Sequence, residues 1–471
     1  MKERTRKYMK YVLSASAAIL CIFALGACKK EQVTSPKETP PLGEESPKIL
    51  SMPTGLAVED WALKWEAVEH ADGYCVSVSG QDFYTDSTTY DLYDYLVPSK
   101  TYFLSVSAVG DGETYLDSDF ADLHYQAPAP TEGLAYYLNE DGMSYTVKSP
   151  NGALITQGEL VLPDKYQGKP VTEIAQYGFA TPLLVNGASY PPDWKFISAV
   201  RLPAGLKKVN DHAFSATDLT KVRLPKTLEE IGNGAFGGID LTEITIPQSV
   251  TKIGGYVFGG KKLAKVEVLG SPSMGVEVFS EKSVWYQNQP NGYIYFNKTL
   301  YRHKGDFPAG TVLDEFPQPT EKIAGGAFSK CAGLTEIVIP ADVVDIGNSV
   351  FSYCRDLEKV SFSGGVTVLN GVSFMGCSNL KQVRLPQGLK EIGAAEFAEC
   401  VSLCEIELPA SLKKISGGAF SGCENLTSAV FKDPKGWNWA SEEVLADPTT
   451  AAQELTKERF GDWYWIKTEE E

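Results

Sequence analysis

The sequence is poor in the residues that enzymes most often use for catalysis. Only four histidines occur among 471 residues, namely His70, His124, His212 and His303. They show no H-E-x-x-H spacing, which would place two metal ligands on one helix face. No G-x-S-x-G nucleophile turn and no phosphate-binding glycine loop stands out either. We therefore expect a chain that is not an enzyme and that holds no cofactor or metal.

Positive charge is also in short supply. Lysine and arginine number 43 against 60 acidic residues, which gives a net charge of −17. A chain of this sign is repelled by nucleic acid phosphates and by anionic lipid head groups. The balance excludes nucleic acid as an expected partner.

The apolar run at the N-terminus is too short for an ordinary membrane span. Residues 11–27 carry no charge, and this run of roughly 17 residues falls below the about 20 that a helix needs to cross a bilayer. Basic residues precede it, so residues 1–27 are typical of a secretory signal peptide. The stretch Leu25-Gly26-Ala27-Cys28 resembles the bacterial lipobox. That resemblance implies a lipid on Cys28, a flexible tether over residues 28–50, and an extracytoplasmic, surface-exposed protein held to the membrane by this anchor.

Residues 51–127 alternate apolar and polar side chains between turn signals, which predicts a small β-sandwich. The pattern resembles fibronectin type III domains on three features: an early core tryptophan (Trp65), the Gly73-Tyr74 strand entry, and the stretch from Leu96 to Tyr102. Tyr102 occupies the position of that family's tyrosine corner. The resemblance implies a spacer or a binding module.

A phenylalanine recurs at a fixed spacing through most of the remaining chain. The spacing is 22 residues in the first set and 23 in the second. One repeat of this length cannot bury its own apolar face, whereas stacked repeats can. The periodicity therefore predicts a solenoid. The phenylalanines are Phe214, Phe236 and Phe258, then Phe328, Phe351, Phe374, Phe397 and Phe420, with an earlier copy at Phe179 and a degenerate one at Phe279.

The repeats, such as the one beginning EITIPQSVTKIGGYVF at Glu243, resemble BspA-type leucine-rich repeats from about Leu160 to Val430. The resemblance implies a mainly β fold, with a right-handed leucine-rich repeat solenoid over residues 134–431 and a C-terminal capping module over 432–471. Members of that family are surface proteins associated with attachment to host proteins or other cells. It therefore implies a monomeric adhesin that binds a host or bacterial surface protein.

Five cysteines lie 23 residues apart: Cys331, Cys354, Cys377, Cys400 and Cys423. A spacing equal to the repeat places one cysteine per coil in a single column, with the thiols pointing in parallel. Metal ligands must instead converge on one point, and disulfides need suitable side-chain vectors. We expect a column of buried thiols, with disulfides or metal binding as alternatives.

Alternate residues of each predicted strand point away from the core. One such column alternates in charge, through Lys221, Glu243 and Lys265 and later Glu336, Lys359, Gln382 and Glu405. A second column holds Arg201, Arg223 and Arg384, interrupted by other residue types. This face is either a solvated, self-neutralising surface or a binding surface.

Two insertions interrupt the regular repeats, over residues 181–196 and 283–307. Exposed aromatic rings bind sugars and protein partners well. The candidate ligand-binding residues are Tyr190, Trp194, Trp285, Tyr286, Tyr293 and Tyr295. Local packing within each insertion is the alternative. If these rings line a groove, they favour a glycan partner and a role in polysaccharide capture.

Overall fold

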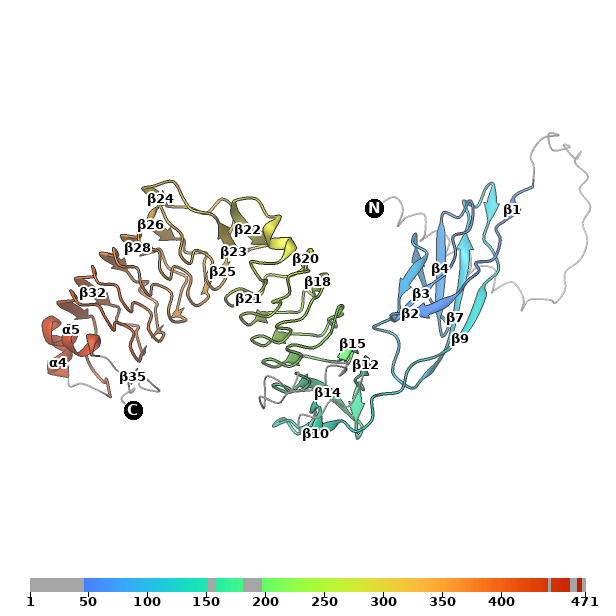
Figure 1. Cartoon of the computed structure of the whole chain (residues 1–471), viewed down its shortest axis with the longest axis horizontal. Coiled ribbons are helices and arrows are strands. Elements are labelled where there is room, and N and C mark those ends of the chain that lie inside the picture. Colours follow the sequence, from blue (N-terminus) through green and yellow to red (C-terminus); the bar gives the residue numbers. More distant parts are fainter. Residues whose placement is uncertain (1–45, 151–157, 181–196, 439–441, 458–463, 468–471) are drawn as a thin grey trace, which may run out of the picture.

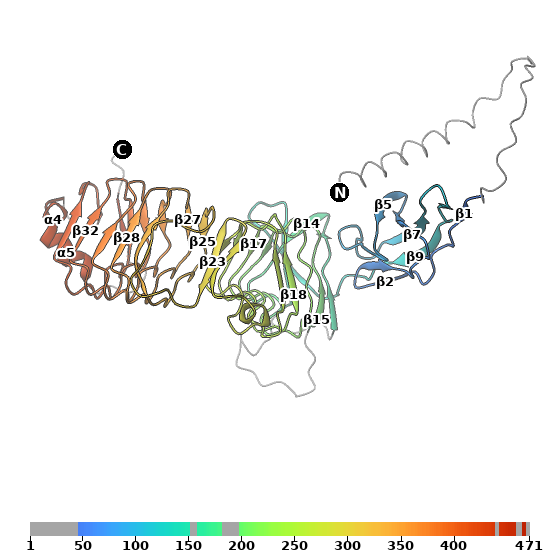
Figure 2. The same ribbon diagram turned by 90° about the horizontal axis from the view of Figure 1, so that it is seen from above.

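The computed structural model describes residues 46–150, 158–180, 197–438, 442–457 and 464–467. This part of the chain forms an arch with a separate β-domain beside one of its ends (Figure 1). Viewed from above, that N-terminal β-domain (residues 46–127) lies at the opposite end of the molecule from the C-terminal helices (Figure 2). Within these ranges no helix combines the length and the apolar character that crossing a membrane requires.

The N-terminal β-domain is built from two antiparallel sheets that share one core. Its strands are β1 (Lys48–Ile49), β2 (Ala57–Glu59), β3 (Ala62–Lys64), β4 (Gly73–Val78), β5 (Gln81–Thr85), β6 (Thr89–Asp91), β7 (Thr101–Val109), β8 (Tyr115–Leu116) and β9 (Ala121–Gln126). The sheets have the orders β2-β3-β6 and β5-β4-β7-β9, and β1 pairs with β8. Leu63, Trp65, Val76, Leu104 and Val106 are buried between them.

Tyr102 makes a local contact that fixes the start of β7. Its hydroxyl accepts a hydrogen bond from the Val97 N–H at 2.7 Å. This is the bond of a tyrosine corner, in which the ring ties a strand to the chain a few residues upstream. The fibronectin type III assignment itself stays a prediction.

Most coils of the solenoid contribute two short strands, here called outer and inner because they lie on the outer and inner sides of the arch (Figure 1). The outer strands are β12 (Gly158–Val161), β15 (Ile197–Arg201), β18 (Glu243–Ile246), β20 (Lys265–Val268), β24 (Thr311–Leu313), β26 (Leu334–Ile339), β28 (Lys359–Phe362), β30 (Gln382–Arg384), β32 (Glu405–Leu408) and β34 (Ser428–Phe431). The inner strands are β14 (Lys169–Ile174), β16 (Lys208–Val209), β17 (Glu230–Ile231), β19 (Lys252–Ile253), β21 (Ser273–Met274), β25 (Lys322–Ile323), β27 (Asp345–Ile346), β29 (Val368–Leu369), β31 (Glu391–Ile392) and β33 (Lys414–Ser416). The first coil adds β10 (Ala135–Leu138), β11 (Tyr145–Lys148) and β13 (Lys165–Tyr166).

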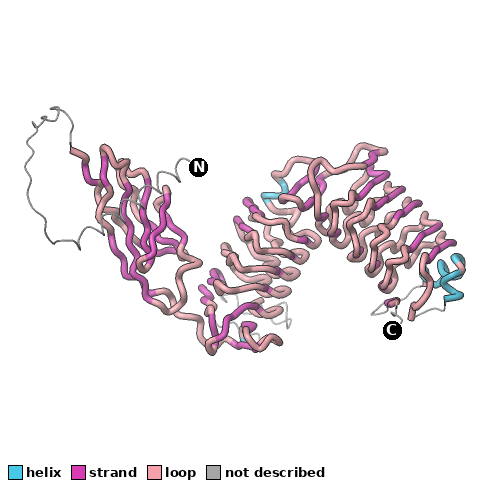
Figure 3. The backbone as a smooth tube through the Cα atoms, turned by 180° about the vertical axis from the view of Figure 1, so that it is seen from behind, coloured by secondary structure: helices cyan, strands magenta, loops and turns pink. Residues whose placement is uncertain are grey.

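The outer strands follow directly from the repeat motif. In β18, Ile244 and Ile246 are buried while Glu243 and Thr245 are exposed, because side chains alternate across a strand. The proline that follows ends the strand, since it has no N–H to donate. Successive outer strands pair in parallel, as Glu243 does with Lys265. The predicted leucine-rich repeat solenoid is confirmed, with most of each coil in loops (Figure 3).

The phenylalanines stack face to face inside the solenoid as two columns. Neighbouring ring centroids lie 5.2–5.7 Å apart, with Phe179, Phe214, Phe236, Phe258 and Phe279 in one column and Phe328, Phe351, Phe374, Phe397 and Phe420 in the other. Stacking at this distance follows from the strand spacing of about 4.8 Å. Phe279, although its repeat is degenerate, belongs to the first column.

The cysteine column is buried and its thiols are free. Four thiols donate hydrogen bonds to phenylalanine carbonyls of the preceding coil: Cys354 to Phe328 (2.9 Å), Cys377 to Phe351 (3.1 Å), Cys400 to Phe374 (3.1 Å) and Cys423 to Phe397 (3.0 Å). The predicted column of buried thiols is confirmed. Each of these carbonyls also accepts the N–H of the cysteine in its own coil, so the thiol is a second donor to an oxygen that has two lone pairs.

The insertion at residues 283–307 lies at the bend of the arch (Figure 1). It forms the helix α3 (Val284–Gln287) and the hairpin of β22 (Gly292–Phe296) and β23 (Thr299–Lys304). The buried core divides here into two clusters. We call residues 134–279 the N-terminal arm and residues 311–431 the C-terminal arm.

The C-terminal segment covers the last coil. It contains α4 (Glu442–Ala446), α5 (Pro448–Thr456) and β35 (Tyr464–Ile466). Strand β35 pairs antiparallel with β33, and Trp437 and Trp465 pack against Phe431. These contacts occupy a strand edge that would otherwise be open to association.

Candidate binding surface

The outer face of the solenoid carries the charged columns. In the C-terminal arm, Lys359 pairs with Glu336 of the preceding coil at 3.2 Å, as the alternating charges predict. Both side chains are about two-fifths exposed, 41% and 42%, so the pair adds little stability. The face is therefore free to present these charges to a partner.

In the N-terminal arm the same face is covered by the β-domain. The Arg201 side chain is fully buried, with 0% exposure, although its column was expected to face solvent. That expectation is wrong for Arg201 because residues from far earlier in the sequence pack over it. The guanidinium carbon lies 5.3 Å from the Trp61 ring centroid and 5.8 Å from that of Tyr93, distances typical of cation–π contacts.

Buried charge at Arg201 is balanced by polar groups on both sides of the interface. The guanidinium binds both carboxylate oxygens of Asp164, at 2.6 and 3.2 Å. It also donates to the carbonyl oxygens of Leu162 and Leu96, at 3.3 and 2.9 Å. Leu96 belongs to the β-domain, so this one side chain joins both parts of the molecule. A buried arginine is stable only with such partners.

Tyr93 completes this interface. Its hydroxyl accepts from the Leu202 N–H at 2.7 Å and burial raises the pKa of the ring hydroxyl. At the rim, the exposed ion pairs are Arg223 with Asp91, Lys221 with Asp60 at 3.6 Å, and Lys226 with Asp94 at 2.6 Å. The β-domain therefore occupies the first coils through a buried centre and a charged rim.

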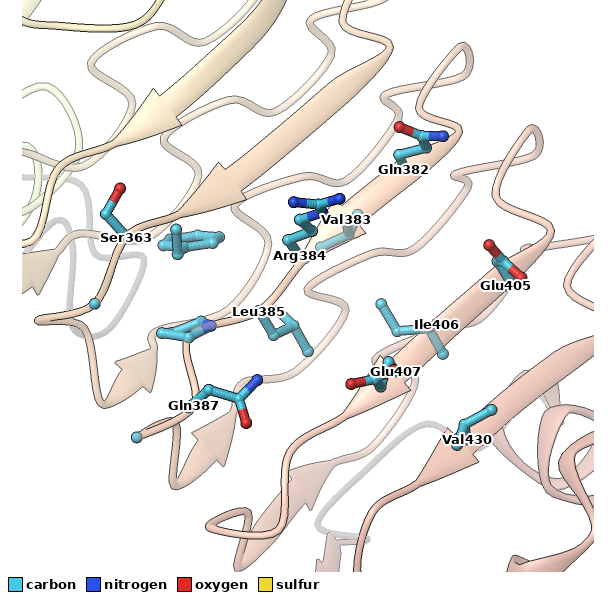
Figure 4. A pocket seen from close by; sticks show the side chains of 14 residues that line it. Ser363, Gln382, Val383, Arg384, Leu385, Gln387, Glu405, Ile406, Glu407 and Val430 are labelled. Atoms are coloured by element: carbon cyan, nitrogen blue, oxygen red, sulfur yellow. The ribbon is translucent and has the colours of Figure 1, made fainter.

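In the C-terminal arm the outer face holds an open groove of about 640 Å³. Gln382 and Arg384 of β30 and Glu405 and Glu407 of β32 project on the same side of the two strands (Figure 4). Buried apolar side chains form the floor: Phe362, Val383, Leu385 and Ile406. Such a mixture of apolar floor and polar rim is typical of protein interfaces.

The charges of the groove are incompletely paired. Glu407 pairs with Lys432 at 3.0 Å. Arg384 and Glu405 are exposed and make no ion pair within the residues that the structure describes. An exposed arginine can reach a partner carboxylate with two parallel hydrogen bonds. The groove was missed from the sequence because its strands carry no unusual pattern. The one available signal is a stretch that occurs twice, at Val200–Lys207 and Val383–Lys390, identical at seven of eight positions.

The predicted aromatic sites are not exposed where the structure describes them. Trp285 and Tyr286 are each only 8% exposed. Trp285 packs against Phe279 and Phe296, with ring centroids 5.3 and 5.7 Å away. The expectation of exposed rings is wrong for these two residues, because their apolar surface fills the bend between the arms.

Tyr293 and Tyr295 are half-buried against the core of the C-terminal arm. The Tyr295 hydroxyl lies 3.0 Å from the Thr320 hydroxyl. Ligand binding by these residues stays a prediction that the packing does not favour. Tyr190 and Trp194, with the whole insertion 181–196, lie outside the described residues. So does Cys28, the predicted lipidation site.

The pair Cys331 and His303 brings a thiol close to an imidazole. The sulfur lies 4.0 Å from His303 Nδ1. Burial raises the pKa of the Cys331 thiol to about 11 and lowers the pKa of His303. A thiol in this state is not ionised near neutral pH, so the pair lacks the thiolate that attack requires. Elsewhere among the described ranges, no three His, Cys, Asp or Glu side chains are placed to hold a metal ion.

A comparison with known protein families identifies the repeat. A family model for the BspA type leucine-rich repeat region matches residues 193–304 and 314–433, in six copies. These two parts of the solenoid therefore consist of BspA-type leucine-rich repeats. No curated protein sequence matches the chain.

Several solved structures are similar to this chain. A leucine-rich cell surface protein from Faecalibacterium prausnitzii is 21% identical with a TM-score of 0.31, over 64% of this chain and 93% of that one. A leucine-rich repeat protein from Bacteroides ovatus is 24% identical with a TM-score of 0.26, over 64% and 87%. The pneumococcal vaccine antigen PcpA is 18% identical with a TM-score of 0.29, over 65% and 82%.

Proposed function

We propose that this chain, whose solenoid contains BspA-type leucine-rich repeats, is a non-catalytic cell-surface recognition protein. It binds a protein on a host or neighbouring cell through the outer face of its C-terminal arm. The observation that carries the proposal is the open groove between β30 and β32. The equivalent face of the N-terminal arm already binds a protein domain, the chain's own β-domain, so this kind of face is suited to protein contacts.

A glycan-binding accessory role is the alternative, and we rank it second. It was based on exposed aromatic rings, and the rings of the second insertion that the structure describes are buried or half-buried. A groove with charged side chains on both sides suits a protein partner better, because protein interfaces combine an apolar core with a polar rim.

The test is a paired array of glycans and of extracellular-matrix and bacterial surface proteins, probed with the chain from Cys28 onward. We expect binding to a protein spot that falls at least about tenfold for Arg384→Glu, since tenfold corresponds to losing about 1.4 kcal/mol. Arg355→Glu is the matched control, because Arg355 is an exposed arginine of the same arm that does not line the groove. Binding to glycans alone favours the second role, and binding to neither class contradicts both.

The proposed surface location depends on a lipid at Cys28. Metabolic labelling with radioactive palmitate tests it in the expressing bacterium. Label is expected on the intact protein and absent from Cys28→Ala, because that thiol is the proposed attachment atom. Label that persists in the variant contradicts the anchor without bearing on the groove.

A further inference from the structure

The stretch that occurs twice in this chain marks two equivalent places on the outer face. Strand β15 ends at Arg201 of Val200-Arg201-Leu202-Pro203, and strand β30 ends at Arg384 of Val383-Arg384-Leu385-Pro386. The same four residue types also occur at 222–225, but no outer strand forms there and the next residues differ. The strand register supports the equivalence, since Arg201 lies opposite Val161 of the preceding coil and Arg384 lies opposite Ser361. The first place holds the β-domain and the second is the groove.

At the first place the arginine has an acidic partner within the solenoid, and at the second place that partner is missing. Arg201 is neutralised by Asp164, which stands three residues after Val161. Three residues after Ser361 the chain has Gly364, which lines the groove. The groove therefore has an arginine in the same position without the in-chain carboxylate. At the first place, the Ala204 N–H also donates a hydrogen bond to the Asp164 carboxylate, at 2.8 Å. At the groove, Gln387 occupies the position that matches Ala204.

Both places coincide with a break in the outer sheet. Strands β12 and β15 form a pair of their own, and the next coil has no outer strand at residues 221–225. Likewise, β30 ends one sheet and β32 begins another. At the first break, the Leu202 N–H bonds to the Tyr93 hydroxyl in place of a neighbouring strand. At the second, among the described residues, no ladder joins the Leu385 amide to β32.

From this correspondence we propose that the groove is a second docking site of the same kind, and that its occupant is a partner protein's loop bearing a carboxylate and a tyrosine. The carboxylate binds Arg384 as Asp164 binds Arg201, and the tyrosine hydroxyl reaches the open strand end at Leu385. This inference rests on the proposed function and names the partner chemistry. One difference between the two sites restricts the partner further. Glu407 occupies the position at the groove that Arg223 occupies at the first site. The groove thus accepts a single acidic residue near Arg384 and disfavours a second beside Glu407.

The chain supplies its own probe. The peptide Thr89–Leu96 (TYDLYDYL) contains the tyrosine and the aspartates of the docked loop. Fluorescence anisotropy of a labelled, end-blocked peptide against the chain from Cys28 onward measures binding. We expect saturable binding that weakens about tenfold or more for Arg384→Glu and for peptides carrying Asp94→Asn or Tyr93→Phe. The Asp91→Asn peptide should not bind more weakly, because Asp91 pairs with Arg223 at the first site and would face Glu407 at the groove.

A gain of binding separates a real site from a damaged protein. Glu407→Arg recreates the second arginine of the first site, and Glu407 is exposed, so the fold is expected to be unaffected. The acidic peptide should bind roughly threefold or more tightly to this variant, because a like charge is replaced by an opposite one. Arg355→Glu should leave binding unchanged.

Three outcomes overturn the inference: no saturable binding, binding that Arg384→Glu leaves unchanged, or binding lost only in Arg223→Glu. The last would mean that the peptide displaces the β-domain from the N-terminal arm. The proposed function fails separately, if no protein on the array is bound. A protein hit that depends on Arg384, together with a peptide that does not bind, leaves the function standing and rejects the loop chemistry.

Discussion

A single residue, Glu396, departs from its column in the solenoid core. The position before each phenylalanine is small or apolar in other coils, as in Ala327, Val350, Ser373 and Ala419, and all these side chains are buried. Glu396 is also 0% exposed, and its Oε1 has no hydrogen-bond partner within the described residues. Its other oxygen accepts from the Ser373 N–H at 3.4 Å. Burial raises the pKa of this carboxyl from 4.5 to about 7.

Glu396 should therefore make stability depend on pH. Between pH 4.5 and about 7 the folded chain keeps a proton that the unfolded chain has released, so the free energy of unfolding falls as pH rises. The thiols of Cys377 and Cys400 interact electrostatically with Glu396, and their raised pKa values keep them neutral in this pH range. The Glu396→Ala variant lacks this carboxyl, so its free energy of unfolding should not fall in this way. Relative to wild type, its free energy of unfolding should rise by on the order of 3 kcal/mol between pH 4.5 and about 7.

Urea denaturation at several pH values measures this difference. Glu396→Gln should behave like Glu396→Ala, since it too is neutral, while Glu399→Ala on the exposed side of the same coil should follow the wild type. An unchanged pH profile in Glu396→Ala would exclude the buried carboxyl as its source.

At the scale of the repeating element, the cysteine column predicts thiols that do not react. The column thiols are buried and bonded to carbonyls, and burial raises the pKa of Cys377 and of Cys423 to about 12. Only the thiolate reacts quickly with alkylating reagents. In the native protein, iodoacetamide should label exposed Cys404 at least about a hundredfold faster than Cys354, Cys377, Cys400 or Cys423. Peptide mass spectrometry reads each site, and comparable labelling in the column would refute its burial.

The phenylalanine columns predict where the solenoid is most sensitive to truncation. Phe374 is 1% exposed and stacks between Phe351 and Phe397, at 5.3 Å from each. Removing such a ring leaves a cavity and costs about 3–5 kcal/mol. Phe374→Ala should lower the urea midpoint accordingly. Phe120→Ala is the control, since that ring is 44% exposed and its loss should change stability by about 0.5 kcal/mol or less. Equal effects would contradict the packing role of the column.

For the whole molecule, the buried centre of the interface predicts that the β-domain stays docked at high salt. Exposed pairs such as Arg223 with Asp91 contribute about 0–1 kcal/mol each, whereas Arg201 is fully buried between both parts. Removing it leaves the Asp164 carboxylate without its cationic partner, although the Ala204 N–H remains bonded to it, and leaves the Leu96 carbonyl without its donor. Breaking a buried charge pair in this way is strongly unfavourable. Arg201→Met should therefore undock the β-domain.

Small-angle X-ray scattering distinguishes the contribution of the buried Arg201 contacts from that of the exposed ion pairs at the rim. The maximum dimension should change little for wild type between 0.15 and about 1 M salt, where surface charges are screened. It should also change little for the triple variant Lys221→Ala, Arg223→Ala, Lys226→Ala. It should increase for Arg201→Met. Undocking of the wild type by salt alone would show that the rim pairs, and not Arg201, hold the domain.

The repeat architecture could be predicted from the sequence because it depends on local periodicity. Phe374 belongs to a series that recurs at a fixed spacing within each arm, and Cys377 belongs to one that recurs in each coil of the C-terminal arm. Stacked coils can bury such residues in only one way. The charge alternation of Glu336 and Lys359 was predictable for the same reason. The burial of Trp285 was not predictable in this way. It depends on how the two arms meet around the insertion, and the insertion has no counterpart among the regular repeats.

Only the tertiary structure decided the fates of Arg201 and Arg384. Seven of the eight residues in the stretches that contain them are identical, and local pattern predicts the same exposed arginine in both. Arg201 became buried because Trp61, Tyr93 and Leu96, more than a hundred positions away, pack over it and Asp164 neutralises it. Arg384 has Gly364 in place of that aspartate and no domain above it. Burial of a charge is set by partners brought from elsewhere in the chain, so the repeat sequence determined the scaffold, and the tertiary contacts decided which of its two matching sites was left open.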